Sequence, residues 1–160
     1  MADLGRRGLF GAIGAAATKK QTPVRPPYAA DVSLFGTHCP ACEGMCGTAC
    51  EEAIIKFDDR HLPYLDFSKS GCTDCEACLE ACTPDVLCDK MQPIRATVRI
   101  NPVKCMSWHD VMCFSCKEPC LDNAIAFKGL FKPEIDTARC TACGFCIARC
   151  PSDAIEIFAT

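Results

Sequence analysis

The stretch CTACGFCIARCP at residues 140–151 decides how this chain folds, because its four cysteines follow the spacing C-x2-C-x2-C-x3-C and Pro151 closes the run. Residues 72–82, CTDCEACLEAC, repeat that spacing unchanged. Three cysteines in so short a loop can surround one inorganic centre, while the backbone N–H groups of the loop point toward the sulfurs and offset their negative charge. The chain therefore carries at least two copies of a metal-binding loop.

Two further cysteine groups extend the repeat. Residues 39–50, CPACEGMCGTAC, hold one extra residue between the second and third cysteines, and Gly44 can accommodate it because glycine adopts positive φ at little cost. Residues 105–120, CMSWHDVMCFSCKEPC, loop out after the first cysteine and then resume the pattern. The first cysteines of the four runs recur at intervals of 33, 33 and 35 residues, so one module is used four times.

The spacing of the runs also indicates the cofactor. In bacterial ferredoxins the run C-x2-C-x2-C-x3-C binds [4Fe–4S] clusters, and its fourth cysteine ligates the neighbouring cluster. Four runs therefore predict four [4Fe–4S] clusters. The predicted ligands are Cys39, Cys42, Cys46, Cys50, Cys72, Cys75, Cys78, Cys82, Cys105, Cys113, Cys116, Cys120, Cys140, Cys143, Cys146 and Cys150.

Zinc and disulfides are the alternatives to clusters. Paired C-x2-C units bind zinc, but two unbroken four-cysteine runs favour clusters. The odd count of 17 cysteines argues against a pure disulfide framework. Cys88 stands outside the runs, and we expect a buried inert thiol there, with a redox or alternative ligand role as the other interpretation.

Composition indicates that the chain needs such a cofactor to fold. It has 160 residues, of which 49% are hydrophobic when cysteine is counted. Without cysteine that share falls to about 38%, below the usual share of about 45–50%. Small units with a thin apolar core depend on disulfides, metal or oligomerisation for stability. We therefore expect cluster binding and folding to be coupled.

Short apolar segments around the runs predict the fold. Residues 53–57 and 64–67 read as one hairpin, and residues 124–127 and 131–135 read as a second. Further strand signals lie at 32–35, 97–100 and 154–158, with a weak one at 86–87, and a short helix can begin near the end of each run. The result is an α+β fold of two tandem ferredoxin-like units, each β-α-β-β-α-β and each holding two clusters. The predicted boundaries are a flexible N-terminal segment at 1–27 and units at 28–92 and 93–160.

Each hairpin connects two runs closely, so neighbouring runs are expected to exchange their fourth cysteine. The first unit would then group Cys39, Cys42 and Cys46 with Cys82, and Cys72, Cys75 and Cys78 with Cys50. The second would group Cys105, Cys113 and Cys116 with Cys150, and Cys140, Cys143 and Cys146 with Cys120. A nested arrangement, with the two inner runs paired inside the two outer runs, is the alternative and uses the same ligands.

Charge and the absence of other motifs exclude several functions. The formal net charge is -3, and four clusters with their sixteen thiolates would make it about -11, a surface that repels phosphate backbones. The sequence has no phosphate loop, no G-x-G-x-x-G motif and no evident pair of catalytic carboxylates. No run approaches the roughly 18 apolar residues of a transmembrane span. We therefore expect no enzymatic activity, nucleic-acid partner or transmembrane segment.

Beyond the cysteines, the chain resembles the ferredoxin-type NapF family, whose members accompany periplasmic nitrate reductase. The resemblance rests on Arg6-Arg7-Gly8, Arg25-Pro26-Pro27-Tyr28, Thr37-His38-Cys39, Tyr64-Leu65-Asp66-Phe67 and the loop after Cys105. It implies a cytoplasmic four-cluster accessory protein that contacts the catalytic subunit of nitrate reductase before export, to install or reduce its iron–sulfur centre. A general electron-transfer polyferredoxin, or an electron-transfer subunit of a larger redox complex, is the alternative.

Polar residues near the runs and at the N-terminus leave their roles open. Arg6 and Arg7 look like the start of a twin-arginine signal, but the apolar stretch that follows is short and lacks an evident cleavage site, so retention in the cytoplasm is expected. A contact surface, a vestigial signal and a disordered basic tail are the three interpretations of this pair. For His38, Trp108 and His109 we expect packing or surface roles in preference to ligation.

Overall fold

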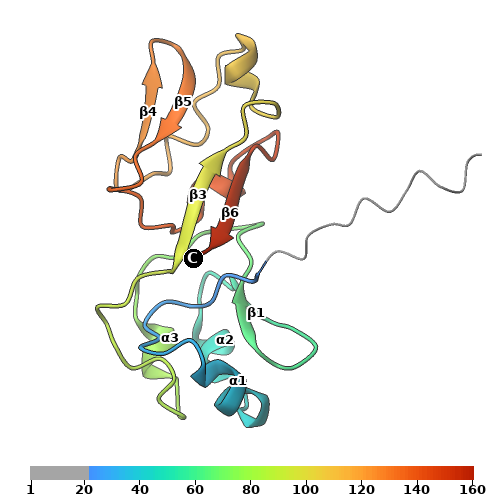
Figure 1. Cartoon of the computed structure of the whole chain (residues 1–160), viewed down its shortest axis with the longest axis vertical. Helices are drawn as coiled ribbons and strands as arrows, with labels where there is room; N and C mark the ends of the chain where they lie inside the picture. Colours follow the sequence, from blue (N-terminus) through green and yellow to red (C-terminus); the bar gives the residue numbers. More distant parts are fainter. Residues whose placement is uncertain (1–21) are drawn as a thin grey trace, which may run out of the picture.

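The computed structural model describes residues 22–160, so the expectations for residues 1–21, including Arg6 and Arg7, lie outside the described residues. The chain forms two lobes stacked end to end (Figure 1). The first lobe contains α1 (Leu34–His38), η1 (Cys39–Ala41), α2 (Met45–Ala49), β1 (Ile55–Phe57), β2 (Pro63–Leu65) and α3 (Ala77–Glu80). The second contains β3 (Ala96–Ile100), η2 (Met106–His109), β4 (Ile125–Lys128), β5 (Phe131–Ile135), α4 (Phe145–Ala148) and β6 (Ile155–Ala159).

The second lobe has two antiparallel strand pairs. Its first and last strands, β3 and β6, lie together with Val98 opposite Ile157, and the inner hairpin pairs β4 with β5. Alternation along these strands buries Val98 and Ile125 and leaves their neighbours more exposed. The strands predicted near 97–100, 124–127, 131–135 and 154–158 are confirmed.

The first lobe keeps only the inner hairpin of the same plan. Strands β1 and β2 pair with Ile55 opposite Leu65, which confirms the hairpin predicted from residues 53–57 and 64–67. In the described residues the outer pair is reduced to a single bridge between Ala29 and Leu87. Pro26 and Pro27 lie just before that bridge, and because proline has no N–H group it cannot extend a ladder of hydrogen bonds. The expected β-α-β-β-α-β order is therefore incomplete in this lobe.

The strand predicted at 32–35 is wrong, because the chain is already helical at Leu34. The Ser33 N–H donates to Asp31 Oδ1 at 2.8 Å, which turns the chain into the first helical turn. Phe35 is 2% exposed and Leu34 is partly buried against the core, while Val32 is 41% exposed. The apolar character of this stretch therefore places Phe35 in the core from a short helix, and does not indicate a strand.

Residues 24–27, expected within the flexible segment, pack against the first lobe. The Leu65 N–H donates to the Val24 carbonyl at 2.8 Å, and Arg25 Nη1 donates to the Pro63 carbonyl at 2.6 Å. Val24 is buried, which explains why the chain follows β2 here. The ordered lobe therefore begins before Tyr28.

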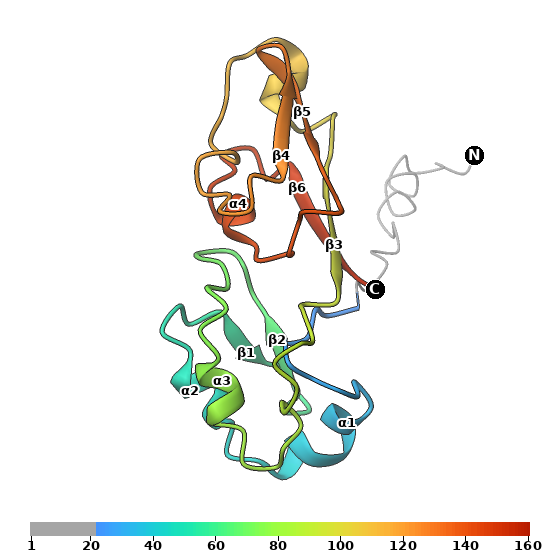
Figure 2. The same ribbon diagram turned by 90° about the vertical axis from the view of Figure 1, so that its left-hand side faces the viewer.

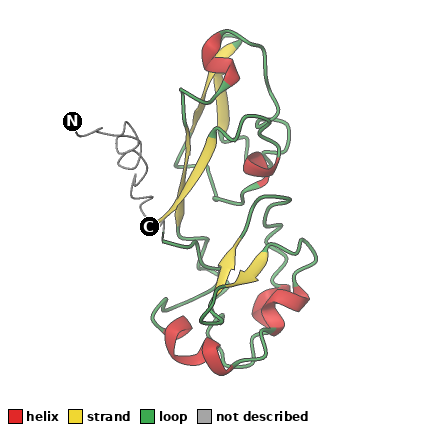
Figure 3. Cartoon of the chain, turned by 90° about the vertical axis from the view of Figure 1, so that its right-hand side faces the viewer, coloured by secondary structure: helices red, strands yellow, loops and turns green. Residues whose placement is uncertain are grey.

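Short helices and two-stranded sheets are mixed in both lobes, which confirms the α+β class (Figures 2 and 3). Cysteines contribute to the core directly, since Cys39, Cys78, Cys116 and Cys146 are among the buried residues. Of the helices in residues 22–160, none has the length and apolar character needed to cross a lipid bilayer.

Candidate iron–sulfur sites

The two regular runs adopt the same loop conformation. In the second run Asp74 and Glu76, on either side of Cys75, have φ of 58° and 62°. In the fourth run Ala142 and Gly144, on either side of Cys143, have φ of 58° and 87°. Each loop then enters a short helix, α3 or α4, that carries the third cysteine of its run. Two left-handed residues around the middle cysteine wrap the loop around a common point.

The sixteen cysteines of the runs are brought together in four sets, each with three residues of one run and the trailing cysteine of its neighbour. Set 1 is Cys39, Cys42, Cys46 and Cys82; set 2 is Cys72, Cys75, Cys78 and Cys50; set 3 is Cys105, Cys113, Cys116 and Cys150; set 4 is Cys140, Cys143, Cys146 and Cys120. The trailing cysteine thus lies with the adjacent run in both lobes.

The members of a set surround a pocket. Set 1 lines one together with Phe35 and Val86, set 2 lines another together with Tyr28, and set 4 lines a third with Val98 and Ile125. Within residues 22–160, no three His, Cys, Asp or Glu side chains form a group suited to a single metal ion. In three of the sets, four sulfurs spread around an apolar pocket, which is the donor arrangement that fits a larger inorganic centre.

Each trailing cysteine is followed by a turn with a left-handed residue three positions later. These residues have φ of 48–53°, and they are Ala53, Asp85, Asn123 and Asp153. Beyond three of these turns a backbone N–H donates to the trailing sulfur: Leu87 to Cys82, Ala124 to Cys120 and Ala154 to Cys150, at 3.2–3.3 Å. Such bonds offset thiolate charge, and sequence reasoning missed them. The sequence does carry a signal for these turns. Three of the four left-handed positions hold Asp or Asn, residues that tolerate left-handed backbone.

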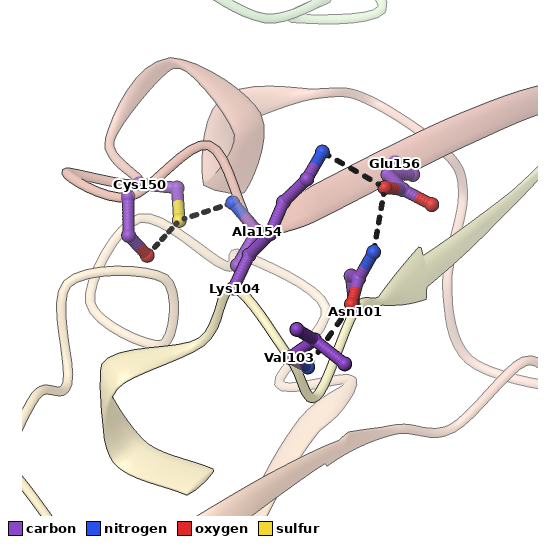
Figure 4. A network of polar contacts seen from close by, with 7 residues as sticks. Asn101, Val103, Lys104, Cys150, Ala154 and Glu156 are labelled. Atoms are coloured by element: carbon purple, nitrogen blue, oxygen red, sulfur yellow. Dashed lines mark hydrogen bonds and ion pairs between the residues drawn. The ribbon is translucent and has the colours of Figure 1, made fainter. Parts of the chain in front are cut away.

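Side chains connect the two segments that form set 3 (Figure 4). Asn101 Nδ2 and Lys104 Nζ both donate to Glu156 Oε1, at 3.0 and 3.1 Å, and these bonds lower the pKa of Glu156. The Cys105 N–H donates to the Asn101 carbonyl at 3.0 Å. The network therefore connects residues 101–104, just before the third run, to β6, the strand that follows Cys150 in the chain.

The two regular runs are tied to their trailing partners in a similar way. Thr141 Oγ1 donates to Asp122 Oδ2 at 2.6 Å, which links the fourth run to the residues after Cys120. Ser70 Oγ donates to Glu52 Oε2 at 2.5 Å, which links the approach to the second run to the residues after Cys50. Side-chain hydrogen bonds thus link the segments that follow three of the four trailing cysteines, Cys50, Cys120 and Cys150, to the runs that complete their sets.

Burial raises the thiol pKa values at the centre of the sets. Desolvation is the largest cause, followed by neighbouring thiols, and it raises the pKa of Cys39 and Cys116 to about 11 and those of Cys78 and Cys146 to about 12. These groups are therefore thiols at neutral pH until a cationic centre displaces their protons. Binding such a centre must release protons.

The two irregular runs are accommodated by local contacts. Gly44 has a φ of 74°, as the extra residue of the first run requires, and a Cβ there would lie 2.9 Å from the Phe57 ring. In the third run the inserted residues form η2, where Trp108 Nε1 donates to the Pro133 carbonyl at 3.4 Å and His109 Nε2 lies 3.0 Å from the Val103 carbonyl. His38 is exposed. Trp108 and His109 thus make packing and backbone contacts.

Two residues outside the runs bear on the sites. Tyr28, buried beside set 2, donates from its hydroxyl to Asp74 Oδ1 at 2.5 Å, and burial together with Asp74 raises its pKa. Ser107 Oγ, two residues after Cys105, is buried with no hydrogen-bond partner among the described residues. Cys88 is exposed, which corrects the expectation that this thiol is buried.

Comparison with known proteins places these sites in a wider context. A family described as a 4Fe–4S binding domain matches residues 133–156, which include the whole fourth run. The ferredoxin-type protein NapF of Escherichia coli (strain K12) is 30% identical over 157 residues, covering 96% of this chain and 93% of the relative. NapF of Haemophilus influenzae is 31% identical, covering 84% of this chain and 78% of the relative. One subunit of the ion-translocating oxidoreductase complex of Methanosarcina acetivorans is 30% identical, covering 71% and 45%.

Proposed function

We propose, from the premise that this chain belongs to the NapF family of ferredoxin-type proteins, that its sixteen run cysteines bind four [4Fe–4S] clusters in two tandem units. The observation that carries the proposal is the arrangement of the cysteines in four sets of four, each with a trailing cysteine from the neighbouring run. A bound [4Fe–4S] cluster supplies reversible one-electron chemistry.

The residues of each set have three tasks in this proposal. Four thiolates hold the cluster, while the N–H groups of Leu87, Ala124 and Ala154 offset charge at three trailing sulfurs. Apolar residues such as Val86 and Val98, both buried, limit access of water to the sulfurs. Together the thiolates, the N–H groups and the apolar residues allow a charged centre to be buried in a thin core, because its charge is compensated by hydrogen bonds.

Metal and sulfide analysis tests the cluster assignment. Anaerobically purified protein should contain about sixteen irons and about sixteen acid-labile sulfides per chain. A preparation that holds zinc and no labile sulfide would contradict the proposal.

We further propose that the protein acts in the cytoplasm on the catalytic subunit of a periplasmic nitrate reductase, helping to load or reduce the iron–sulfur centre of that protein before its export. Family membership and the protein's four one-electron sites support this role, as does the lack of any motif for hydrolysis or nucleotide binding in the sequence. On this basis the protein is an accessory factor and not an enzyme, and its partner is a protein.

A deletion strain tests the accessory role. Cells without the protein should make a catalytic subunit that is present but poorly active and deficient in cluster, and the precursor of the reductase should co-purify with the protein. Replacing Arg6 and Arg7 by Ala should weaken that co-purification and leave the iron content unchanged, since neither side chain is a cluster ligand. Export of fully active enzyme from the deletion strain, in iron-poor and iron-rich medium alike, would refute this role.

A second candidate is electron transfer within a larger redox complex. Similarity to one component of an ion-translocating oxidoreductase complex over 71% of this chain favours it. Isolation of the protein in a stable complex with membrane-bound redox proteins, and not with a nitrate reductase precursor, would support this candidate over the accessory role.

A further inference from the structure

We propose that electrons pass between the two lobes through the backbone contact of Cys72 with Cys143, so that the four cysteine sets form one path in the order 1, 2, 4, 3. The inference rests on the proposed function, because it requires a cluster in each set. It goes beyond that function by giving the order in which the sets are connected, which differs from their order in the sequence.

The contact between the lobes joins a loop of set 2 directly to a loop of set 4. The Cys72 N–H donates to the Cys143 carbonyl oxygen at 2.7 Å. Both residues are predicted ligands, so the connection from one sulfur to the other consists of the covalent bonds of two cysteines and a single hydrogen bond. No intervening side chain is needed.

Two glycines make this close approach possible. A Cβ on Gly71 would lie 2.6 Å from the Phe145 backbone nitrogen and 2.7 Å from the Cys143 carbonyl oxygen. A Cβ on Gly144 would lie 2.1 Å from the ring of Phe67, which is itself 4% exposed. Any other residue at either position would push the facing loop away. The two loops can therefore lie in contact only because neither glycine has a side chain.

Within each lobe the two sets also approach each other, through the third cysteine of each run. Helix α2, which carries Cys46 of set 1, packs against α3, which carries Cys78 of set 2. In the second lobe Cys116 of set 3 and Cys146 of set 4 are both buried in the same core cluster. Sets 2 and 4 therefore each face two neighbours, whereas sets 1 and 3 each face one.

The overall shape agrees with sets 1 and 3 as the ends of the path. Helix α1, which leads into the first run, and η1, which begins that run, lie at one end of the molecule, and η2 of the third run lies at the other (Figures 1 and 2). With clusters bound in sets 2 and 4, a step between the lobes would move one electron, so that the cluster held by set 2 would be oxidised by one electron and the cluster held by set 4 reduced by the same electron.

Electron paramagnetic resonance of the fully reduced holoprotein tests the order. Adjacent reduced clusters have interacting spins, so the wild type should show coupling within both lobes and between them. Gly71→Ala should lose the coupling between lobes and retain the coupling within each. Gly36→Ala is the matched control, because a Cβ there meets nothing within 4 Å and it should leave the spectrum unchanged.

Iron content separates failure of this inference from failure of the proposed function. If wild-type iron falls well short of about sixteen per chain, the cluster assignment fails. If iron is complete and the Gly71→Ala spectrum equals that of the wild type, the order 1, 2, 4, 3 is wrong and the assignment stands. Should Gly71→Ala itself lose iron, Phe67→Ala decides: it removes the ring that packs on Gly144 at the joint between the lobes without adding an atom, and unchanged coupling in that variant overturns the inference.

Discussion

Replacing Tyr28 by Phe should accelerate cluster loss from set 2 alone. The ring of Tyr28 is buried, and its hydroxyl donates to Asp74 Oδ1, between the first two cysteines of the second run. Phe keeps the ring in place and removes only that bond. The second run then loses the contact that holds its left-handed loop residue to the segment before α1.

The size of the effect follows from the exposure of Asp74. A hydrogen bond to a charged group contributes about 1.5–3 kcal/mol, and a neutral one about 0.5–1.5 kcal/mol. Because Asp74 is exposed, water replaces the lost donor in part, and we expect about 1–1.5 kcal/mol. If the bond breaks before iron leaves, the rate should rise by about fivefold to about thirteenfold.

The assay is anaerobic iron release to an excess of chelator, followed by absorbance. In Tyr28→Phe about a quarter of the iron should leave in the faster phase, because one set of four is affected. Tyr64→Phe is the matched control: Tyr64 is the other tyrosine of the chain, and its hydroxyl has no hydrogen-bond partner within residues 22–160. Equal rates for Tyr28→Phe and the wild type, or equal acceleration by Tyr64→Phe, would refute the reasoning.

Two further substitutions test other parts of the site. Cys88→Ser should leave the iron content unchanged, whereas Cys75→Ser, at a cysteine that is also exposed, should lower it by about four irons per chain. Loss of iron from Cys88→Ser would show that one set is wrongly composed. Gly44→Ala should destabilise the holoprotein more than Gly129→Ala in anaerobic thermal unfolding. Both glycines have positive φ, at a cost of about 1–2 kcal/mol for Ala, but only Gly44 faces a ring, that of Phe57. Equal melting shifts would show that the Phe57 contact does not matter.

The parts of the fold that could be predicted from sequence are those with local signals. The spacing of the runs, the strand at 97–100 and the hairpin of residues 124–127 and 131–135 each depend on residues close together in the chain. The positive φ of Gly44 could be predicted from the one extra residue in the first run. These features need no knowledge of distant segments.

What could not be predicted depends on distant contacts. Residues 32–35 carry enough apolar character for a strand, but Asp31 starts a turn and Phe35 finds its buried position on a helix. The approach of Gly71 to Phe145 joins residues far apart in sequence, and a glycine beside a cysteine run reads equally well as an ordinary loop residue. The exposure of Cys88 likewise depends on how residues 83–92 pack around Tyr28, whose carbonyl accepts the Cys88 N–H at 3.0 Å.

The joint between the lobes bears on which runs can change length over evolution. The second and fourth runs meet there, where the Cys72 N–H donates a hydrogen bond to the Cys143 carbonyl, and an inserted residue in either run would have to suit both its own pocket and the facing loop. The first and third runs lie away from the joint, and they are the two that contain additional residues. In this chain the additional residues are thus confined to the loops with a free side, where a longer loop has only its own pocket to fit.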